Sequence, residues 1–179
     1  MAWKTIVRPE PIEAKFCVPP DLSSEDRNLL FAAWRRRPRA RAPYSHYKVG
    51  AAVRTVSGEI FSGCNVEINT YTEGTHAEQA AIVSAVGEAE GDMRVRTVAI
   101  VAAHERVQPP NPIQGDGWPD LDEVDLSWAG APCGHCLQII NEFKVGPDTR
   151  LISYLPGGIV SIVRFGDALP FSFDPADIA

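Results

Sequence analysis

The feature that most constrains the fold is an apolar run at residues 97–102, which lies between two segments of helical character. A short continuous apolar run of this kind is typical of a buried strand. The helical segments span residues 76–88 and 133–143. Because helices that alternate with strands can cover both faces of a sheet, the sequence predicts an α/β protein with three layers.

Shorter segments extend this pattern on both sides. Residues 48–56 and 59–64 have strand character, and the Ser-Gly pair between them is a two-residue hairpin signal. Residues 151–154 and 159–165 are predicted to be two further strands. Ahead of the hairpin, Ser23 or Ser24 can cap a helix that ends before Pro38.

The chain divides into an arm, a domain and an insertion. Residues 1–22 contain several prolines and little periodicity, so we expect an extended N-terminal arm. Residues 23–179 are expected to form a single domain. Residues 104–131 are rich in proline and acidic side chains, and a loop of this length inside a compact domain is usually functional or disordered.

Composition excludes several classes of protein. The 179 residues are 45% hydrophobic and 22% charged, a balance typical of globular domains rather than disordered or disulfide-scaffold proteins. No apolar run approaches the roughly 18 residues of a membrane span. The absence of an apolar segment at the N-terminus predicts a cytoplasmic protein.

The net charge of −6 argues against a dedicated nucleic-acid binder. A local exception is a group of arginines at the end of the first predicted helix. Cations there favour the helix dipole, although a patch for phosphate or RNA stays open as an alternative. The group consists of Arg35, Arg36, Arg37, Arg39 and Arg41.

Two short motifs each begin a predicted helix. One is His-Ala-Glu from His76, and the other is Pro-Cys-Gly-His-Cys with Cys133 and Cys136. In a reducing compartment a close cysteine pair indicates metal binding or catalysis. Taken alone, the pair also allows thiol–disulfide exchange, or a structural zinc knuckle that would need two more ligands.

Together the motifs indicate a catalytic zinc site. His76, Cys133 and Cys136 supply three ligands, and a catalytic zinc keeps its fourth position open for water. Glu78 is two residues from His76 and can accept the proton of that water. The combination is the signature of zinc nucleobase deaminases. The alternatives without a catalytic role are that His76 is an ordinary surface histidine and that Glu78 is a first-turn acid that complements the helix dipole.

With these motifs the sequence resembles the cytidine deaminase family over about two thirds of its length. The resemblance implies a mixed five-stranded sheet with helices on its faces, and zinc-dependent deamination of a free nucleoside. It also implies a homo-oligomer, dimer or tetramer, with shared active sites. The motifs, in family order, are APYS at 42–45, VGAA at 49–52, GCNVE at 63–67, HAE at 76–78, PCGHC at 132–136 and LPFSFDP at 169–175.

The resemblance also implies roles for single residues. Glu78 would move protons first to N3 of the ring and then to the leaving ammonia. Asn65 and Glu67 would hydrogen-bond the ribose, and backbone groups at Ala77 and near Ala131 would contact the base. Tyr47 would pack on the nucleoside, and Phe173 would reach the site of a neighbouring subunit.

Three departures from the family pattern keep alternatives open. Glu78 and Cys133 stand 55 positions apart, and the excess lies in the insertion. Leu137 stands where the family commonly has arginine, and residues 68–75 differ from the usual loop. The alternative substrates are another amino heterocycle, such as a modified nucleoside or nucleoside antibiotic, and a polynucleotide. A structural zinc or interaction module is the non-enzymatic alternative.

Overall fold

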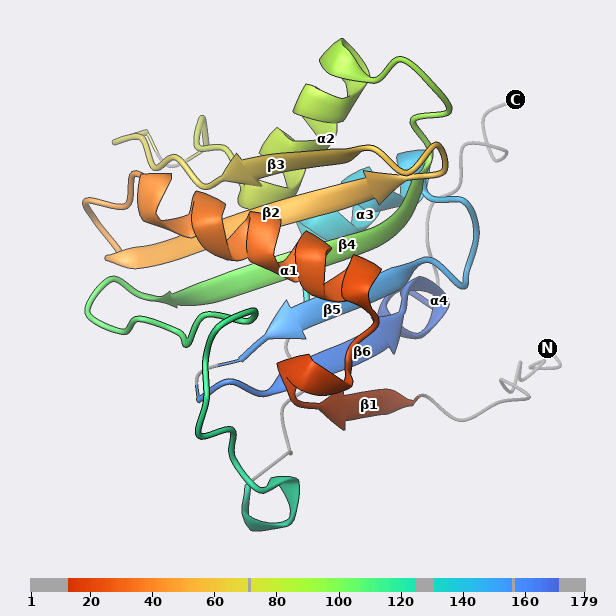
Figure 1. Cartoon of the computed structure of the whole chain (residues 1–179). Helices are drawn as coiled ribbons and strands as arrows, with labels where there is room; N and C mark the ends of the chain where they lie inside the picture. Colours follow the sequence, from red (N-terminus) through yellow and green to blue (C-terminus); the bar gives the residue numbers. More distant parts are fainter. Residues whose placement is uncertain (1–12, 71, 125–130, 156, 171–179) are drawn as a thin grey trace, which may run out of the picture.

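The computed structural model describes residues 13–70, 72–124, 131–155 and 157–170. They form one mixed sheet with helices on both faces, which confirms the predicted α/β class (Figure 1). The strands are β1 (Ala14–Cys17), β2 (Tyr47–Thr55), β3 (Ile60–Cys64), β4 (Val95–His104), β5 (Arg150–Tyr154) and β6 (Val160–Arg164). The helices are α1 (Ser24–Arg36), α2 (Ala77–Glu88), α3 (Gly134–Phe143) and α4 (Phe165–Ala168), with 3₁₀ turns η1 (Pro19–Asp21), η2 (Arg37–Arg39) and η3 (Leu121–Glu123).

The sheet has the strand order β1-β6-β5-β4-β2-β3. Only the β4–β5 pair is parallel, and the other neighbours are antiparallel. Parallel neighbours need a long crossover connection, and here it includes α3. The apolar run at 97–102 lies in β4, a central strand, as its composition predicts.

The sheet has six strands where the family resemblance led us to expect five. The additional strand is β1, which comes from the segment expected to be an extended arm. Its residues pair antiparallel with β6, from Ala14 opposite Val163 to Cys17 opposite Val160. No local periodicity marks this strand, because its position depends on a partner almost 150 residues away in the sequence.

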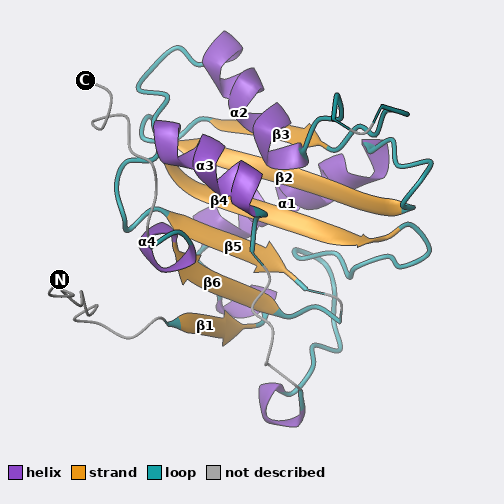
Figure 2. Cartoon of the chain, turned by 180° about the vertical axis from the view of Figure 1, so that it is seen from behind, coloured by secondary structure: helices purple, strands orange, loops and turns teal. Residues whose placement is uncertain are grey.

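Helices cover the sheet from both sides. Helix α1 begins after Ser23, whose hydroxyl accepts a hydrogen bond from the Asp26 N–H, as expected of an N-cap. It lies across one face (Figure 1), and α2, α3 and α4 lie on the other (Figure 2). Each face has its own buried apolar cluster, one under α1 and one under α2 and α3.

Two glycines allow the helices to lie close to the sheet. A Cβ atom at Gly50 would come within 2.2 Å of the Ala33 carbonyl oxygen of α1. On the other face, a Cβ at Gly63 would lie 2.4 Å from the Ala81 nitrogen of α2. Real Cβ atoms do not approach this closely, so both positions require glycine for packing.

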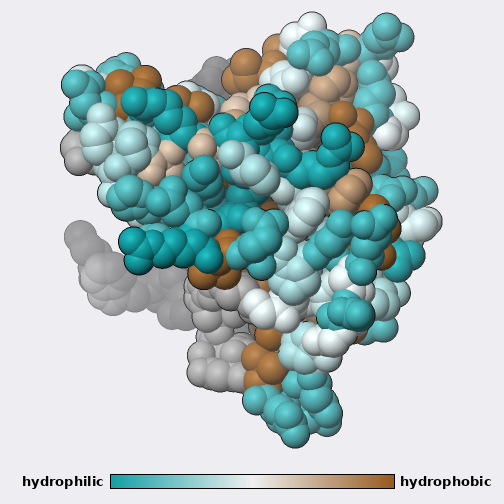
Figure 3. Space-filling model, turned by 60° about the vertical axis from the view of Figure 1, so that its left-hand side comes forward, coloured by the Kyte–Doolittle hydropathy of each residue, from teal (hydrophilic) through white to brown (hydrophobic). Residues whose placement is uncertain are grey.

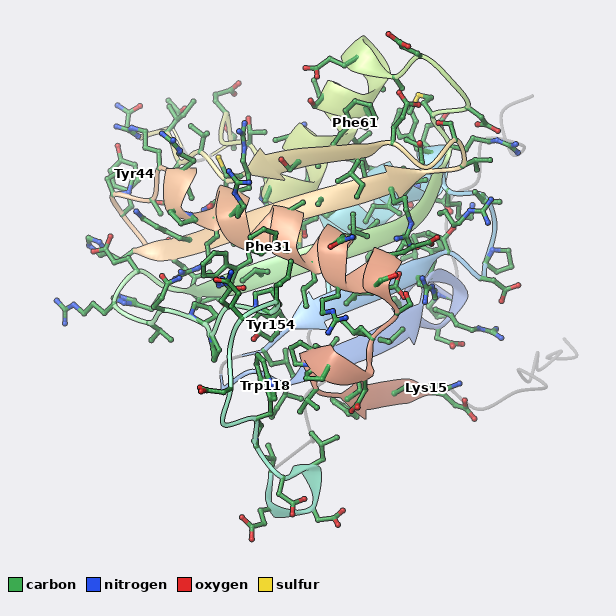
Figure 4. The ribbon with its side chains drawn as sticks, in the orientation of Figure 1. Lys15, Phe31, Tyr44, Phe61, Trp118 and Tyr154 are labelled. Atoms are coloured by element: carbon green, nitrogen blue, oxygen red, sulfur yellow. The ribbon has the colours of Figure 1, made fainter. Side chains whose placement is uncertain are left out.

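The insertion runs along the α1 side of the sheet before η3 projects away from the body (Figure 1). The Trp34 indole N–H donates to the Pro109 carbonyl at 2.9 Å, and the Tyr154 hydroxyl donates to the Pro110 carbonyl at 3.1 Å. Trp118 packs against the cluster under α1, near Tyr154 (Figure 4). The projecting tip is hydrophilic (Figure 3).

Arg37 is buried, whereas the other members of the arginine group are exposed. It is 3% exposed, and its guanidinium donates to the carbonyls of Lys48, Ala103, His104 and Val107. The residue therefore fastens the start of the insertion to the end of α1.

Among the described residues, no helix combines the length and apolar character needed to cross a bilayer.

Candidate active site

The metal-binding motifs meet where two helices begin. His76 is the N-cap of α2 and Cys133 is the N-cap of α3, so each ligand lies at a helix start. Cys136 follows in the first turn of α3 and is fully buried. Because both helices pack on the same face of the sheet and contact each other, these starts come together.

The three side chains form a compact donor set. His76 Nδ1 lies 3.3 Å from the sulfur of Cys133 and 3.3 Å from the sulfur of Cys136. All three donor atoms lie within 4.8 Å of one another. Tetrahedral zinc, with bonds of about 2.0–2.3 Å, needs nitrogen–sulfur separations of about 3.6 Å. The geometry and the chemistry of the donors fit a zinc ion.

A buried carboxylate lies beside this donor set. Glu78 is 6% exposed, in the first turn of α2. Burial, followed by the negative charges of Glu78 and Cys133, raises the pKa of the Cys136 thiol. A bound dication reverses this preference, because it stabilises thiolates directly. The charge distribution thus favours a metal ion.

The donor set opens into a cavity of about 550 Å³. This volume is within the usual range of ligand sites. His76, Glu78 and Cys133 line one wall. The lining also includes Tyr47, Val49, Asn65, Val66, Glu67, Ile68, Gly74, Thr75, Ala77, Ile100, Ala102, Ala131, Ser153, Tyr154 and Leu155.

The Asn65 amide closes the end of the hairpin at the cavity edge. Its Oδ1 accepts from the Val49 N–H at 2.8 Å, and its Nδ2 donates to the Tyr47 carbonyl at 3.0 Å. An amide has a second N–H and a second lone pair, so it can also bind a sugar hydroxyl. The same contacts position Tyr47, which is 41% exposed.

Glu67 is held by the turn that precedes β2. Its carboxylate accepts from the Ser45 hydroxyl, and from the N–H groups of Tyr44 at 3.0 Å and Ser45 at 3.2 Å. The Ser45 hydroxyl and these backbone donors hold the pKa of the Glu67 carboxyl below its usual value. Glu67 is therefore an ionised hydrogen-bond acceptor at the cavity edge.

The structure brings most of the predicted site residues to one cavity. His76, Glu78 and Cys133 line it with the predicted substrate-binding residues Tyr47, Asn65, Glu67 and Ala77. Cys136 lies behind them in α3, and Phe173 lies outside the described residues. Leu137, at the family's arginine position, is buried in the apolar cluster under α2 and α3.

Sequence reasoning missed the β5 side of the cavity. Ser153, Tyr154 and Leu155 line it, although residues 151–154 were predicted only as a strand. A signal was available in the sequence, because this strand follows the cysteine helix and must return to the sheet beside β4. Nothing in its composition, however, distinguishes a cavity wall from ordinary core.

Comparisons with known proteins agree with this site. Residues 23–148 match the family described as "Cytidine and deoxycytidylate deaminase zinc-binding region". The chain is 33% identical over 141 residues to the cytidine deaminase of Salmonella schwarzengrund, and 33% identical over 138 residues to that of Proteus mirabilis. These alignments cover 78% and 76% of this chain but only 36% and 35% of the relatives, so the chain spans about a third of their length.

Solved structures are matched over nearly their whole length. The crystal structure of cytidine deaminase from Burkholderia pseudomallei aligns with a TM-score of 0.60 at 30% identity, over 82% of this chain and 97% of that one. The cytidine deaminase from Mycobacterium tuberculosis aligns with a TM-score of 0.58 at 28% identity, over 83% and 97%. With the family match over residues 23–148, these similarities show that the chain belongs to the cytidine and deoxycytidylate deaminase family of zinc-binding proteins.

Proposed function

We propose that this chain is a zinc-dependent hydrolase that deaminates a cytidine-like free nucleoside to its uridine-type product, with release of ammonia. The carrying observation is the meeting of His76, Cys133 and Cys136 beside the buried Glu78 carboxylate, at the wall of one cavity. Sequence relatives and structural neighbours named as cytidine deaminases support the same reaction.

His76, Cys133 and Cys136 would hold the zinc ion. Zinc, when bound, supplies Lewis-acid activation of a water molecule at neutral pH. The burial of Cys136 and the N-cap positions of the other two ligands fix the donor atoms before the metal binds. The site is thus prearranged by the two helix starts.

Glu78 would act as the proton carrier. Its carboxylate takes a proton from the attacking water and delivers it to ring N3, while the oxygen of that water forms a bond to C4. It then passes the second proton of the water to the 4-amino group. The C4–N bond breaks, ammonia leaves, and C4 becomes a carbonyl. The position of Glu78 beside the donor set supports both transfers.

The edge of the cavity near β3 would bind the sugar. Asn65 and the ionised Glu67 together offer a donor and acceptors to a ribose hydroxyl. The Ala77 backbone and the Tyr47 ring would contact the base from either side. We also propose that Phe173 completes the site of a neighbouring subunit.

The decisive variant is Glu78→Gln. It keeps the size of the side chain but cannot accept a proton, so we expect cytidine turnover to fall by at least about 100-fold while zinc is retained. Ammonia release from cytidine and deoxycytidine, with zinc content measured on the same sample, checks this. Glu59→Gln, at a turn remote from the cavity, is the control and should keep full activity. Normal turnover by Glu78→Gln with zinc bound would contradict the mechanism.

A second candidate is a zinc deaminase that acts on another amino heterocycle, such as a modified nucleoside. The observation that favours it is Leu137, which places an apolar core residue directly after a metal ligand where the family commonly has a cation. A zinc-loaded protein that leaves cytidine and deoxycytidine unchanged but releases ammonia from a modified nucleoside would favour this candidate.

We propose further that the protein works in the cytoplasm as a homo-oligomer, a dimer or a tetramer. A reducing compartment keeps thiols such as Cys133 from forming disulfides, which supports this location. Val83 and Val86 are 64% and 56% exposed on α2, a surface that a second subunit can cover. Light scattering of the purified protein tests the assembly.

The net charge of −6 and the buried position of Arg37 favour a small-molecule partner over nucleic acid.

A further inference from the structure

The floor of the cavity is apolar except for one hydroxyl. Side chains that point to the α2 and α3 face of the sheet form it: Val49 from β2, Ile100 and Ala102 from β4, and Leu155 just beyond β5. Ser153 lies among them and is paired with Ile100 across the parallel strands. It is the single polar side chain in this apolar row.

Ser153 places a hydroxyl group at the floor of the cavity. Ser153 is only 6% exposed, and its side chain makes no hydrogen bond in the part of the chain that the structure describes. A hydroxyl that loses its water when a ligand binds, and gains no new hydrogen bond, lowers the affinity for that ligand. Because Ser153 lines the cavity, a ligand that fills the cavity can supply a hydrogen-bond partner.

The position of Ser153 in the sheet determines which part of a ligand it meets. This argument rests on the proposed function. Asn65 and Glu67 bind the sugar at the β3 edge, whereas β5 lies beyond β2 and β4 on the opposite side. Glu78 belongs to α2, which packs mainly on β2 and β3, and in the proposed mechanism it exchanges a proton with ring N3. The opposite edge of the ring, C5–C6, therefore faces β5 and Ser153.

We propose that Ser153 is a specificity-determining residue, and that the preferred substrates are cytidine-type nucleosides with a hydrogen-bonding group at ring position 5. Unsubstituted cytidine presents only C–H groups on that edge, so its binding would leave the hydroxyl desolvated and unpaired. A site built around a buried polar group discriminates against analogues that cannot satisfy it. A 5-hydroxymethyl group offers both a donor and an acceptor to the serine.

The test compares initial rates for cytidine, 5-methylcytidine and 5-hydroxymethylcytidine in the zinc-loaded protein. The two substituents occupy the same ring position, and only one can hydrogen-bond. We expect kcat/KM for the hydroxymethyl compound to exceed that for the methyl compound by about three- to tenfold, the value of one hydrogen bond. Ser153→Ala should reduce this ratio to about one, and Ser153→Thr, which keeps the hydroxyl, should preserve it.

Ser161→Ala is the matched control. Ser161 lies opposite Ser153 on β6 and is fully buried, but it does not line the cavity, so the ratio should stay at the wild-type value. An equal kcat/KM for the methyl and hydroxymethyl compounds in the wild type would overturn the proposal, as would an unchanged ratio in Ser153→Ala. In either case the deamination of cytidine would still support the proposed function. Failure to deaminate all three nucleosides would overturn both.

Discussion

The two faces of the sheet treat buried charge in opposite ways. Under α1, the carboxylate of Asp26 is 3% exposed and accepts hydrogen bonds from Arg54 at 2.6 Å and from Arg150 at 2.6 and 2.8 Å. Beside α2 and α3, Glu78 and the thiol of Cys136 are also buried. Yet no lysine or arginine stands among the described residues that line that cavity.

This difference indicates that the buried charges of the α1 face stabilise the fold, whereas those of the α2 and α3 face serve the chemistry of the site. The α1 face neutralises its buried carboxylate within the protein, because Asp26 pairs with Arg54 and Arg150. The α2 and α3 face gathers a carboxylate and two thiols, and a bound metal ion would balance the negative charge of their ionised forms. Disturbing the first face should therefore change stability, and disturbing the second should change chemistry.

The largest expected effect is on the cavity side. Cys136→Ala removes one of the three proposed zinc ligands, so we expect zinc to be released and cytidine turnover to fall by more than about 1000-fold. Metal analysis and ammonia release on the same sample measure both losses. Cys64→Ala, at a thiol outside the donor set, is the control. Turnover by Cys136→Ala without bound zinc would contradict the claim that the α2 and α3 face depends on a metal ion.

On the α1 face, Asp26→Asn should change stability instead. Arg54 is 6% exposed, and without the Asp26 carboxylate its only remaining ion pair among the described residues is with the exposed Glu25, at 3.8 Å. We expect the free energy of unfolding in urea to fall by about 3 kcal/mol, with zinc content unchanged. Asp92→Asn, at the exposed pair with Arg94, should leave stability nearly unaltered. Loss of zinc from folded Asp26→Asn would show that the faces are coupled.

Because of the Asp26 carboxylate, we also expect the free energy of unfolding to depend on pH. Burial alone would raise the pKa of Asp26, but the hydrogen bonds from Arg150 and Arg54 outweigh it and hold the pKa below its ordinary value of 3.8. Its stabilising contribution is therefore complete above pH 3.8 and is lost as the pH falls through the folded-state pKa. Urea unfolding of wild type and Asp26→Asn at about pH 5 and about pH 3 measures it. The gap between the two proteins should narrow at the lower pH, and a constant gap would contradict the assignment.

The smallest expected effect concerns the insertion. It accepts a hydrogen bond from Tyr154, which belongs to the apolar cluster under α1 and also lines the cavity. Tyr154→Phe removes only the hydrogen bond to the Pro110 carbonyl and should cost about 1 kcal/mol of stability. Thermal unfolding measures the loss, and Tyr44→Phe serves as a control at an exposed ring. A gain in stability would show that this hydrogen bond does not fasten the insertion.

The site was more predictable than the fold around it. His76, Glu78 and the cysteine pair are short motifs at helix starts, and local spacing identifies them. The β1 strand and the Asp26 network were not predicted, because each depends on partners far away in the sequence. The role of Arg37 was hidden for a similar reason, since its acceptors are carbonyl oxygens and any residue type supplies those.

Ser153 shows a second limit. Strand character predicted β5, but the difference between a core position and a cavity floor lies in what covers it. Most of the other residues that line the cavity come from the hairpin, from β4 and from the starts of α2 and α3, all distant from Ser153 in the sequence. Sequence patterns identify which groups can do chemistry better than they identify what surrounds them.

The ion pair between Asp26 and Arg150 also affects the order in which the chain matures during synthesis. Asp26 leaves the ribosome 124 residues ahead of Arg150. At about 5–20 residues per second, that interval lasts roughly 6–25 s. During that interval α1 can form its apolar contacts with β2, and Asp26 can pair with Arg54. The ion pair of Asp26 with Arg150 is still missing. The last strands of the sheet therefore lock the first long helix in place.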